Sequence, residues 1–359
     1  MKERLGLAMA VWHRCGYERR MRRLSLACIA LLSCAGIAAP PVMAAAVTDQ
    51  NTDRNTAATF DALRQVDGRM AAIAYRLTTA NAGLCRSLAP TPGWVIHSLG
   101  QYDPALRDQA RANFGFETPI AIEAVVPGSA AAAAGLQSND SIVTVDGQAI
   151  GGTAPGKEAS SAARDAAVEQ IAGLPADRPL AVQVMRQGRT RTVTIPASPG
   201  CRSAFEVLLG PGMTASADGR IAQIGVRFFE RYSDDEVAVV VAHELSHNIL
   251  RHAARLDAAG VKRGLLAEVG RNGRLFRLTE DQADILGAYL LRNAGYDPHI
   301  AVQFWREHGG DVDGGLFRSR THPSSSGRAK ALEAAIATMP PGHGFYAPPL
   351  VAEADRPLQ

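Results

Sequence analysis

The chain has 359 residues, of which 47% are hydrophobic and 20% are charged. It is too long for one ordinary domain and too apolar to be intrinsically disordered. Lys and Arg number 38 against 35 Asp and Glu. Seven of these basic residues and two of the acidic ones lie within residues 1–46, so 31 basic residues face 33 acidic ones in the rest of the chain. Without an electrostatic excess, residues 47–359 are not expected to bind nucleic acid or an anionic membrane.

Residues 1–46 are predicted to be a signal peptide. A basic stretch, Arg19 to Arg23, precedes the apolar run Leu24 to Ala38, and small residues suited to cleavage follow it. This run of about 15 residues is shorter than the roughly 20 that span a bilayer, which argues against a membrane anchor. Lipidation at Cys34 is the less favoured alternative, and Met21 is an alternative start to Met1. We therefore expect a periplasmic or secreted mature protein without a transmembrane span.

Two cysteines remain after the predicted signal peptide, Cys85 and Cys201. In an oxidising compartment an even number of cysteines favours a disulfide, and two buried free thiols are the alternative. A bridge between them would close a loop long enough to contribute about 4.7 kcal/mol in the chain-entropy model.

The first element expected after the leader is an amphipathic helix over residues 57–79, because its apolar residues recur at three- and four-residue steps. Residues 47–56 are polar and are expected to be loose. The segment 47–89 as a whole is predicted to pack on a later domain.

Residues 90–199 read as a separate unit. They contain a strand pattern over 120–126, the turn Pro127-Gly128-Ser129, an alanine-rich run ending at Leu136, a strand ending at Asp146-Gly147, and a hairpin pattern turning at Gln187-Gly188. This order resembles bacterial PDZ domains, which implies a small β-barrel-like sheet with two helices. Asn139 stands where such domains usually have glycine, and asparagine tolerates the left-handed backbone that the turn requires.

The PDZ resemblance implies a peptide-binding groove, because these domains add an extended ligand strand to a sheet edge. Phe114, Gly115 and Phe116 resemble the loop that binds the ligand's terminal carboxylate, with two buried core phenylalanines as the alternative. The helix predicted from Lys157 to Gly173 would line the groove with Val168, Ile171 and Ala172.

The residues that indicate chemistry begin at Ser233, which forms a predicted capping box with Glu236 at the start of a helix. Within that helix the chain reads His243-Glu244-Leu245-Ser246-His247. At roughly 100° per residue the two histidines lie about 40° apart on one face, as two ligands of one tetrahedral metal require. In metallohydrolases with this spacing, the glutamate holds the attacking water rather than the metal.

A catalytic zinc site needs a third protein ligand. His252 lies nine residues past His243, about 180° around a continuous helix, so it is predicted to point away from the metal. The metzincin pattern is excluded, because Leu250 and Ala253 stand where it requires glycine and histidine.

Two downstream carboxylates remain candidates for the third ligand, Glu268 and Glu280. Glu280 lies four residues before Asp284, so both acids would share one helical face, and Asp284 could orient a ligand histidine through its free ring nitrogen. The alternative is a helix start, with Thr279 as N-cap and Gln282 completing a capping box.

Taken together, His-Glu-x-x-His and Glu-x-x-Ala-Asp resemble the metallopeptidase family of HtpX-like, CaaX prenyl and periplasmic β-barrel assembly-enhancing proteases. The resemblance covers residues 201–336 and implies one Zn²⁺ per chain, held by His243, His247 and Glu280, with Glu244 as catalytic base. It also implies that Asp284 lies behind the ligands.

Three further features follow from the same family resemblance. Thr321-His322-Pro323 followed by Arg328 matches a family element whose histidine approaches the metal or the reaction oxyanion, although His322 as a plain loop residue is the alternative. Residues 213–224 resemble the family's substrate-binding edge strand. A transmembrane hairpin between the histidines and Glu280 is absent, which argues against the prenyl-processing branch.

The sequence thus predicts an α+β chain in which a mostly helical zincin-type metallopeptidase domain with a small edge sheet, residues 200–345, accompanies an inserted PDZ domain. Residues 346–359 are predicted to be a C-terminal tail. The expected function is an exported zinc endopeptidase acting on protein or peptide substrates, namely misfolded or unassembled envelope proteins, with envelope partners bound through the PDZ domain. The alternative is a PDZ-based holdase with a latent or structural metal centre.

Overall fold

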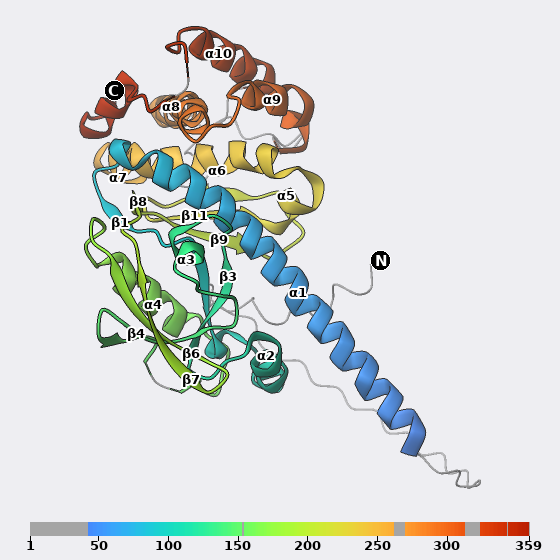
Figure 1. Cartoon of the computed structure of the whole chain (residues 1–359). Coiled ribbons are helices and arrows are strands. Elements are labelled where there is room, and N and C mark those ends of the chain that lie inside the picture. Colours follow the sequence, from blue (N-terminus) through green and yellow to red (C-terminus); the bar gives the residue numbers. More distant parts are fainter. Residues whose placement is uncertain (1–41, 153, 262–269, 313–323, 343, 359) are drawn as a thin grey trace, which may run out of the picture.

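A computed structural model describes residues 42–152, 154–261, 270–312, 324–342 and 344–358. Helices α6 and α8 to α10 form one end of the molecule, the PDZ sheet with α2 and α4 forms the other, and helix α1 runs across both (Figure 1). The predicted α+β architecture with an inserted PDZ domain is confirmed. The predicted signal sequence up to residue 41, with Cys34, and the alternative ligand Glu268 lie outside the described residues.

Helix α1 spans Val42–Ala80, so it begins well before the predicted start at residue 57. Residues 47–56, expected to be loose, are helical, and this expectation was wrong. Apolar periodicity reports which side of a helix is buried rather than where the helix begins, and no proline interrupts residues 42–80. None of the helices within the described ranges combines the length and apolar character needed to cross a bilayer.

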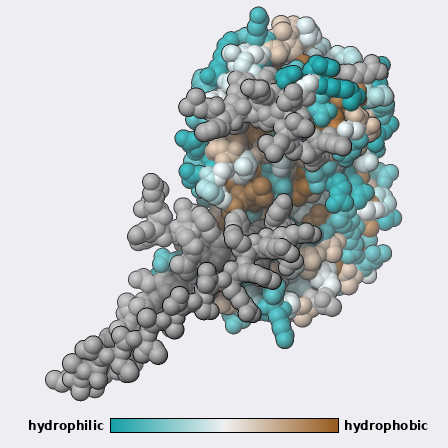
Figure 2. Space-filling view, turned by 180° about the vertical axis from the view of Figure 1, so that it is seen from behind, coloured by the Kyte–Doolittle hydropathy of each residue, from teal (hydrophilic) through white to brown (hydrophobic). Residues whose placement is uncertain are grey.

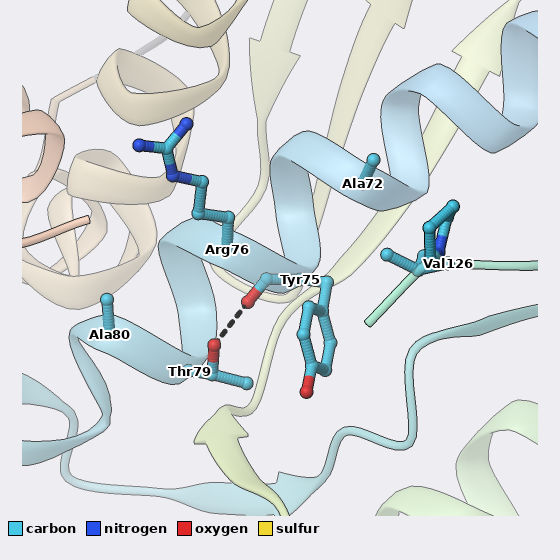
Figure 3. Close-up of a pocket in the computed structure, with 7 residues that line it drawn as sticks. Ala72, Tyr75, Arg76, Thr79, Ala80 and Val126 are labelled. Carbon is cyan, nitrogen blue, oxygen red and sulfur yellow. Dashed lines mark hydrogen bonds between the residues drawn. The ribbon is translucent and has the colours of Figure 1, made fainter. Parts of the chain in front are cut away.

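Helix α1 joins the two ends of the molecule because different residues along it belong to different cores. Phe60 packs in an aromatic cluster of the PDZ end, whereas Met70, Ile73 and Leu77 belong to the core around α6 and α8. In Figure 3 the side chain of Arg76 points away from Tyr75, which lines a hollow of about 660 Å³ beside Val126. Arg76 Nε donates to the carbonyl of Ala294 at 2.6 Å, which ties α1 to the end of α8.

The PDZ domain is built on a sheet in the order β2-β3-β4-β6-β7, with the short β5 paired to β4. Its elements are β2 (Trp94–Ser98), α2 (Arg107–Phe114), β3 (Ile120–Val125), α3 (Ala130–Ala133), β4 (Ser141–Val145), β5 (Gln148–Ala149), α4 (Ala162–Ala172), β6 (Leu180–Arg186) and β7 (Arg189–Ile195). The predicted turns are confirmed: Asn139 has a φ of 74°, and Gln187 and Gly188 have φ of 54° and 70°, as a tight hairpin requires.

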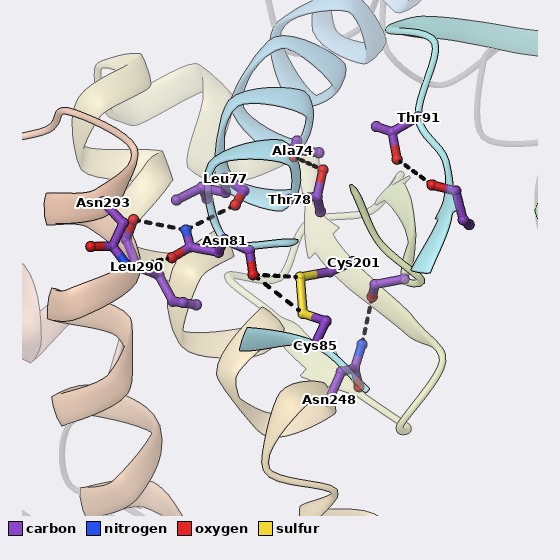
Figure 4. The surroundings of a disulfide bond; sticks show 12 residues. Ala74, Leu77, Thr78, Asn81, Cys85, Thr91, Cys201, Asn248, Leu290 and Asn293 are labelled. Atoms are coloured by element: carbon purple, nitrogen blue, oxygen red, sulfur yellow. Dashed lines mark hydrogen bonds between the residues drawn. A yellow bond between two sulfur atoms is a disulfide. The ribbon is translucent and has the colours of Figure 1, made fainter. Parts of the chain in front are cut away.

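The chain enters and leaves the PDZ domain through a narrow neck. Strand β1 (Leu88–Pro90) pairs antiparallel with β8 (Pro199–Cys201). The predicted disulfide between Cys85 and Cys201 is present beside this pair and closes a separation of 116 residues. Figure 4 shows Asn81 next to the bridge, where its side-chain amide donates to the carbonyls of Leu77 and Leu290 at 2.9 and 3.1 Å. The inserted domain is therefore fastened to both α1 and α8 at its base.

The remaining elements form the predicted peptidase domain. They are a sheet in the order β10-β11-β9, from β9 (Ala204–Leu208), β10 (Ala215–Ala217) and β11 (Ile221–Gly225), and the helices α5 (Val226–Arg231), α6 (Asp234–Ile249), α7 (His252–Ala258), α8 (Gly270–Asn293), α9 (His299–Val312) and α10 (Ser325–Ala337). The segment 213–224, predicted as an edge strand, forms both β10 and most of β11, and of these two strands only β10 lies at an edge of the sheet. The segment predicted as a tail instead forms the 3-10 helix η6 (Pro349–Asp355), whose Ala354 is buried in the core of this domain.

Candidate metal centre

Helix α6 begins as the sequence predicts. Ser233 Oγ accepts from the amide of Glu236 at 3.3 Å, and the Glu236 carboxylate accepts from the amide of Ser233 at 2.8 Å. Three acidic residues in the first turn favour the helix dipole. The whole stretch from Val237 to Ser246 is buried, so this helix passes through the core and carries its two histidines with it.

Helix α8 crosses α6 closely and brings in the third ligand. A Cβ atom at Gly287 would lie 3.4 Å from the backbone nitrogen of His243, so the small residue permits this approach. Thr279 lies inside α8, and its hydroxyl donates to the carbonyl of Phe276 at 2.7 Å. The alternative in which Thr279 caps a helix start was therefore wrong. Helix α8 already begins at Gly270, and the middle of the helix packs against α6.

The three predicted ligands meet at one point. The Nε2 atoms of His243 and His247 are 3.1 Å apart. Glu280 places one carboxylate oxygen 3.3 Å from Nε2 of His243 and the other 3.5 Å from Nε2 of His247. Among the described residues this is the one group of three or more His, Cys, Asp or Glu that could hold a metal ion. Two imidazole nitrogens and a carboxylate oxygen are the donor set of a catalytic zinc site, so the residues fit that ion.

An ion pair behind the ligands fixes His243. Nδ1 of His243 lies 2.9 Å from a carboxylate oxygen of Asp284, and Arg328 Nε donates to the other oxygen of Asp284 at 2.6 Å. The Arg328 guanidinium lies over the Trp305 ring, 3.4 Å from its centroid. Asp284 therefore lies behind the ligands, as the resemblance implies, Arg328 holds its carboxylate, and His243 is oriented with Nε2 towards Glu280.

The two histidines differ in their electrostatics. Burial disfavours the charged form of both rings, but at His243 the carboxylates of Asp284 and Glu280 outweigh burial and raise its pKa to about 10. Burial dominates at His247 and lowers its pKa to about 4. A metal ion must therefore displace a proton from His243 at neutral pH, whereas His247 is already neutral.

His252 is not where the sequence reasoning placed it. Helix α6 ends at Ile249, and Arg251 adopts a left-handed conformation with φ of 56° before α7 begins at His252. The side chain of His252 therefore turns back to the site, and its Nδ1 lies 2.9 Å from Nδ1 of His247. His252 is not among the three ligands, as expected, but the reason given for this was wrong because it assumed one continuous helix. No glycine marks the break, so the sequence carried no clear signal of it.

The two predicted catalytic residues differ in what the structure describes. Glu244 lies on α6 between the two histidines and is 6% exposed. His322 lies outside the described residues, as do its neighbours Thr321 and Pro323.

The predicted carboxylate-binding loop of the PDZ domain needs correction. Phe114 and Phe116 are buried with Phe60 and Tyr102 in an aromatic cluster. The amides of Gly115 and Phe116 both donate to the carbonyl of Arg111, because this segment is the C-terminal cap of α2. These amides are therefore committed within the fold, and the alternative of core phenylalanines is what the structure has.

A groove of about 1500 Å³ lies between strand β2 and helix α4 of the PDZ domain and the β8–β9 region of the peptidase domain. The lining of this groove includes Val168, Ile171 and Ala172, as predicted. It also includes Trp94 and neighbouring residues of β2, which the sequence analysis missed. Viewed from behind, apolar residues gather in a hollow across the waist of the molecule (Figure 2). A proline and a glycine before β2 were the signal that could have identified this strand as the groove edge.

Two histidines from one helix and a glutamate from a second, crossing helix are the donor set that zincin-type metallopeptidases use. Residues 261–336 match the model of Peptidase family M48, a range that includes Glu280, Asp284 and Arg328 but follows the His243–His247 motif. Residues 122–167 match the PDZ domain model. The chain therefore contains one segment similar to Peptidase family M48 and another similar to PDZ domains, in agreement with the predicted resemblance.

Two curated relatives are similar over part of the chain. The mitochondrial metalloendopeptidase OMA1 of Schizosaccharomyces pombe is 30% identical over 121 residues, which cover 28% of this chain and 36% of that protein. OMA1 of Arabidopsis thaliana is 34% identical over 119 residues, covering 28% of this chain and 24% of that protein. The chain thus spans about a third or less of the length of these relatives.

Two solved structures are similar to part of the chain. The HtrA-type protease AlgW with a decapeptide is 24% identical, with a TM-score of 0.23, over 31% of this chain and 30% of that one. The HtrA3 PDZ domain bound to a phage-derived ligand is 21% identical, with a TM-score of 0.22, over 31% of this chain and 88% of that one.

Proposed function

We propose that this protein is a zinc-dependent endopeptidase. The observation that carries the proposal is the convergence of both Nε2 atoms of the His-Glu-x-x-His motif with the carboxylate of Glu280, beside a buried Glu244. A structural zinc site fills all four positions with protein ligands, whereas three ligands leave a position for water. A glutamate between the histidines has no use in a structural site but suits proton transfer.

In the proposed reaction different residues of the chain bind the ion, position a ligand and transfer a proton. His243, His247 and Glu280 hold the ion, and Asp284 with Arg328 keeps the His243 ring in place. When bound, the ion supplies Lewis acidity towards the scissile carbonyl and makes a coordinated water more acidic. Glu244 accepts the proton of the attacking water at its carboxylate and passes it to the leaving amine. His322, from the resemblance, stabilises the developing oxyanion.

The proposed substrate is an extended segment of a protein. Strand β10 pairs with β11 on one side only, and no described strand pairs with its other edge. A substrate strand can add to this edge by backbone hydrogen bonds. The groove beside Val168 and Trp94 offers a second binding surface for the same polypeptide, at the neck between the two domains.

The disulfide supports the proposed location. A bridge between Cys85 and Cys201 persists in an oxidising compartment and not in a reducing cytosol. Together with the predicted signal peptide, this supports an exported enzyme that acts on misfolded or unassembled envelope proteins.

The proposal is tested by digestion of an unfolded protein such as casein, with and without a chelator. We expect cleavage that the chelator abolishes and that zinc restores, and Glu244→Gln should reduce the rate by about 10²-fold or more while the ion stays bound. Chelator-resistant binding of casein without any cleavage would favour the alternative of a PDZ-based holdase.

The role of the groove has its own test. Val168→Arg places a charged side chain in the groove, and Ala166→Arg, on the exposed side of the same helix, is the matched control. We expect Val168→Arg to raise KM for a protein substrate about tenfold while hydrolysis of a short peptide is unchanged. Equal effects of the two variants on the protein substrate would contradict a groove contribution.

A further inference from the structure

A third buried histidine lies directly behind one of the metal ligands. His252 is 1% exposed, and its Nδ1 atom lies 2.9 Å from Nδ1 of His247. Two neutral imidazole nitrogens at this distance form a hydrogen bond only when one carries a proton and the other a lone pair. The tautomers of the two rings are therefore coupled, and the proton on one determines the form of the other.

The other side of His252 determines which ring donates. Nε2 of His252 lies 3.1 Å from Oε1 of Gln282, and the same oxygen accepts from Nη1 of Arg255 at 3.1 Å. A guanidinium can only donate, so it fixes the oxygen of the Gln282 amide in this position. An amide oxygen can only accept, so His252 must carry its proton on Nε2. Nδ1 of the neutral His252 ring is then an acceptor.

The tautomer of His252 determines the tautomer of the metal ligand His247. Because Nδ1 of His252 accepts, Nδ1 of His247 must donate, and the lone pair of His247 is left on Nε2. This is the nitrogen that faces Nε2 of His243 and the carboxylate of Glu280. We propose that Arg255, Gln282 and His252 form a positioning chain that holds His247 in the one tautomer able to bind the ion. The inference rests on the proposed metal site.

The fold supports the positioning role independently. Arg255 and Gln282 are 7% and 8% exposed, so water does not compete freely for these bonds. Arg251, with its left-handed φ of 56°, turns the chain so that His252 faces back to His247. Gln282 lies on α8, the helix that also carries Glu280. Helix α8 therefore supplies one metal ligand and helps to orient another, His247.

The tautomer can be read directly from long-range ¹H–¹⁵N NMR spectra of the full chain with ¹⁵N-labelled histidine. We expect His247 to carry its proton on Nδ1 and His252 on Nε2, both in the metal-free protein and with zinc added. A proton on Nε2 of metal-free His247, or on Nδ1 of His252, would overturn the inference. Because the metal-free spectrum suffices, this reading also separates failure of the positioning chain from failure of the metal site.

Zinc affinity, measured by competition with a chelator, tests the same chain in variants. His252→Leu removes the acceptor, and we expect it to weaken zinc binding by about 10- to 100-fold. His252→Asn keeps an acceptor oxygen near Nδ1 of His247 and should stay within a few-fold of the parent. Gln282→Leu should weaken binding as His252→Leu does, which keeps the test available if one variant fails to fold.

His308→Leu is the matched control, since His308 bonds to Glu236 away from the three ligands and its loss should leave zinc affinity unchanged. A natively folded His252→Leu protein, judged by circular dichroism, with parental zinc affinity would overturn the proposal. Equal losses in His252→Leu and His252→Asn would overturn it too, because they would indicate packing rather than an acceptor. If the parent protein binds no zinc at all, the proposed function fails instead.

Discussion

Two buried carboxyl clusters in this molecule have opposite electrostatics. At the metal centre, burial alone would raise the pKa of Asp284, but Arg328 and His243 together outweigh it and hold the pKa below the ordinary value of 3.8. Between α1 and the PDZ sheet, burial dominates instead, and it raises the pKa of Asp67 to about 7 and that of Glu123 to about 8. Asp284 is thus ionised at neutral pH, whereas the half-buried Asp67 and the buried Glu123 have pKa values at or above neutral pH.

The difference lies in what the neighbouring arginines bind. Arg328 donates to both carboxylate oxygens of Asp284. The arginines near Asp67 and Glu123 are engaged elsewhere: Arg64 donates to the Asn139 side chain at 2.7 Å, and Arg164 pairs with Glu206 at 3.0 Å. Nδ1 of His97 lies 3.6 Å from Glu123, but the ring is fully buried, which lowers its pKa well below 6.5. Pairing, not burial, therefore decides which buried acid carries charge.

The largest predicted effect is on the metal centre. Arg328→Met leaves the Asp284 carboxylate buried without its main cation, so we expect a loss of about 3–5 kcal/mol in the free energy of unfolding. Urea unfolding in the presence of a chelator measures this without a contribution from bound metal. The double variant Asp284→Leu, Arg328→Met removes both charges and should recover part of the loss. A loss below about 1 kcal/mol for Arg328→Met would contradict the paired assignment.

A second prediction concerns pH. Because the folded-state pKa values of Asp67 and Glu123 are raised, the folded protein holds protons that the unfolded chain releases, so their contribution to stability is complete below about pH 4 and is lost as pH rises through 7 to 8. Asp284 has the opposite sign, and its contribution is lost as pH falls below 3.8.

The double variant Asp67→Asn, Glu123→Gln tests this pH dependence. Thermal unfolding between pH 5 and pH 8 should be flatter for the variant than for the parent. Parallel pH profiles of the two proteins would show that these carboxyls titrate normally.

The smallest predicted effect sharpens the same comparison. At pH 6 Glu123 is already neutral, so Glu123→Gln replaces one uncharged polar group with another and should change stability by about 1 kcal/mol or less. Asp284→Asn removes an ionised acceptor and should cost about 1.5–3 kcal/mol in the same conditions. The two variants are measured side by side by urea unfolding. A greater cost for Glu123→Gln would reverse the assignment of charge.

The sequence predicted the features of the site that depend on local geometry. His243 and His247 are one turn apart in a single helix, so their spacing alone places both Nε2 atoms on one face. The capping box at Ser233 is equally local. Glu280 was found by its resemblance to a known motif, because no local rule brings α8 across α6.

The predictions that failed concern features that depend on where a helix ends and on which side chains are buried, and a local sequence pattern does not report either. The left-handed Arg251 reorients His252, although arginine gives no hint of such a conformation. Gly115 ends a helix rather than opening a binding loop, and only the packing of Phe114 against Phe60 distinguishes these uses of glycine. The groove edge at β2 was missed because a short strand shows little periodicity, and the proline and glycine before it were the only local signal.

The account depends most on one ion held by His243, His247 and Glu280. Anomalous X-ray diffraction at the zinc edge, from crystals of the purified chain, tests this directly. We predict one anomalous peak per chain, between the two Nε2 atoms and the Glu280 carboxylate. The absence of a peak from zinc-supplemented protein, or a peak only at other residues, would contradict the account.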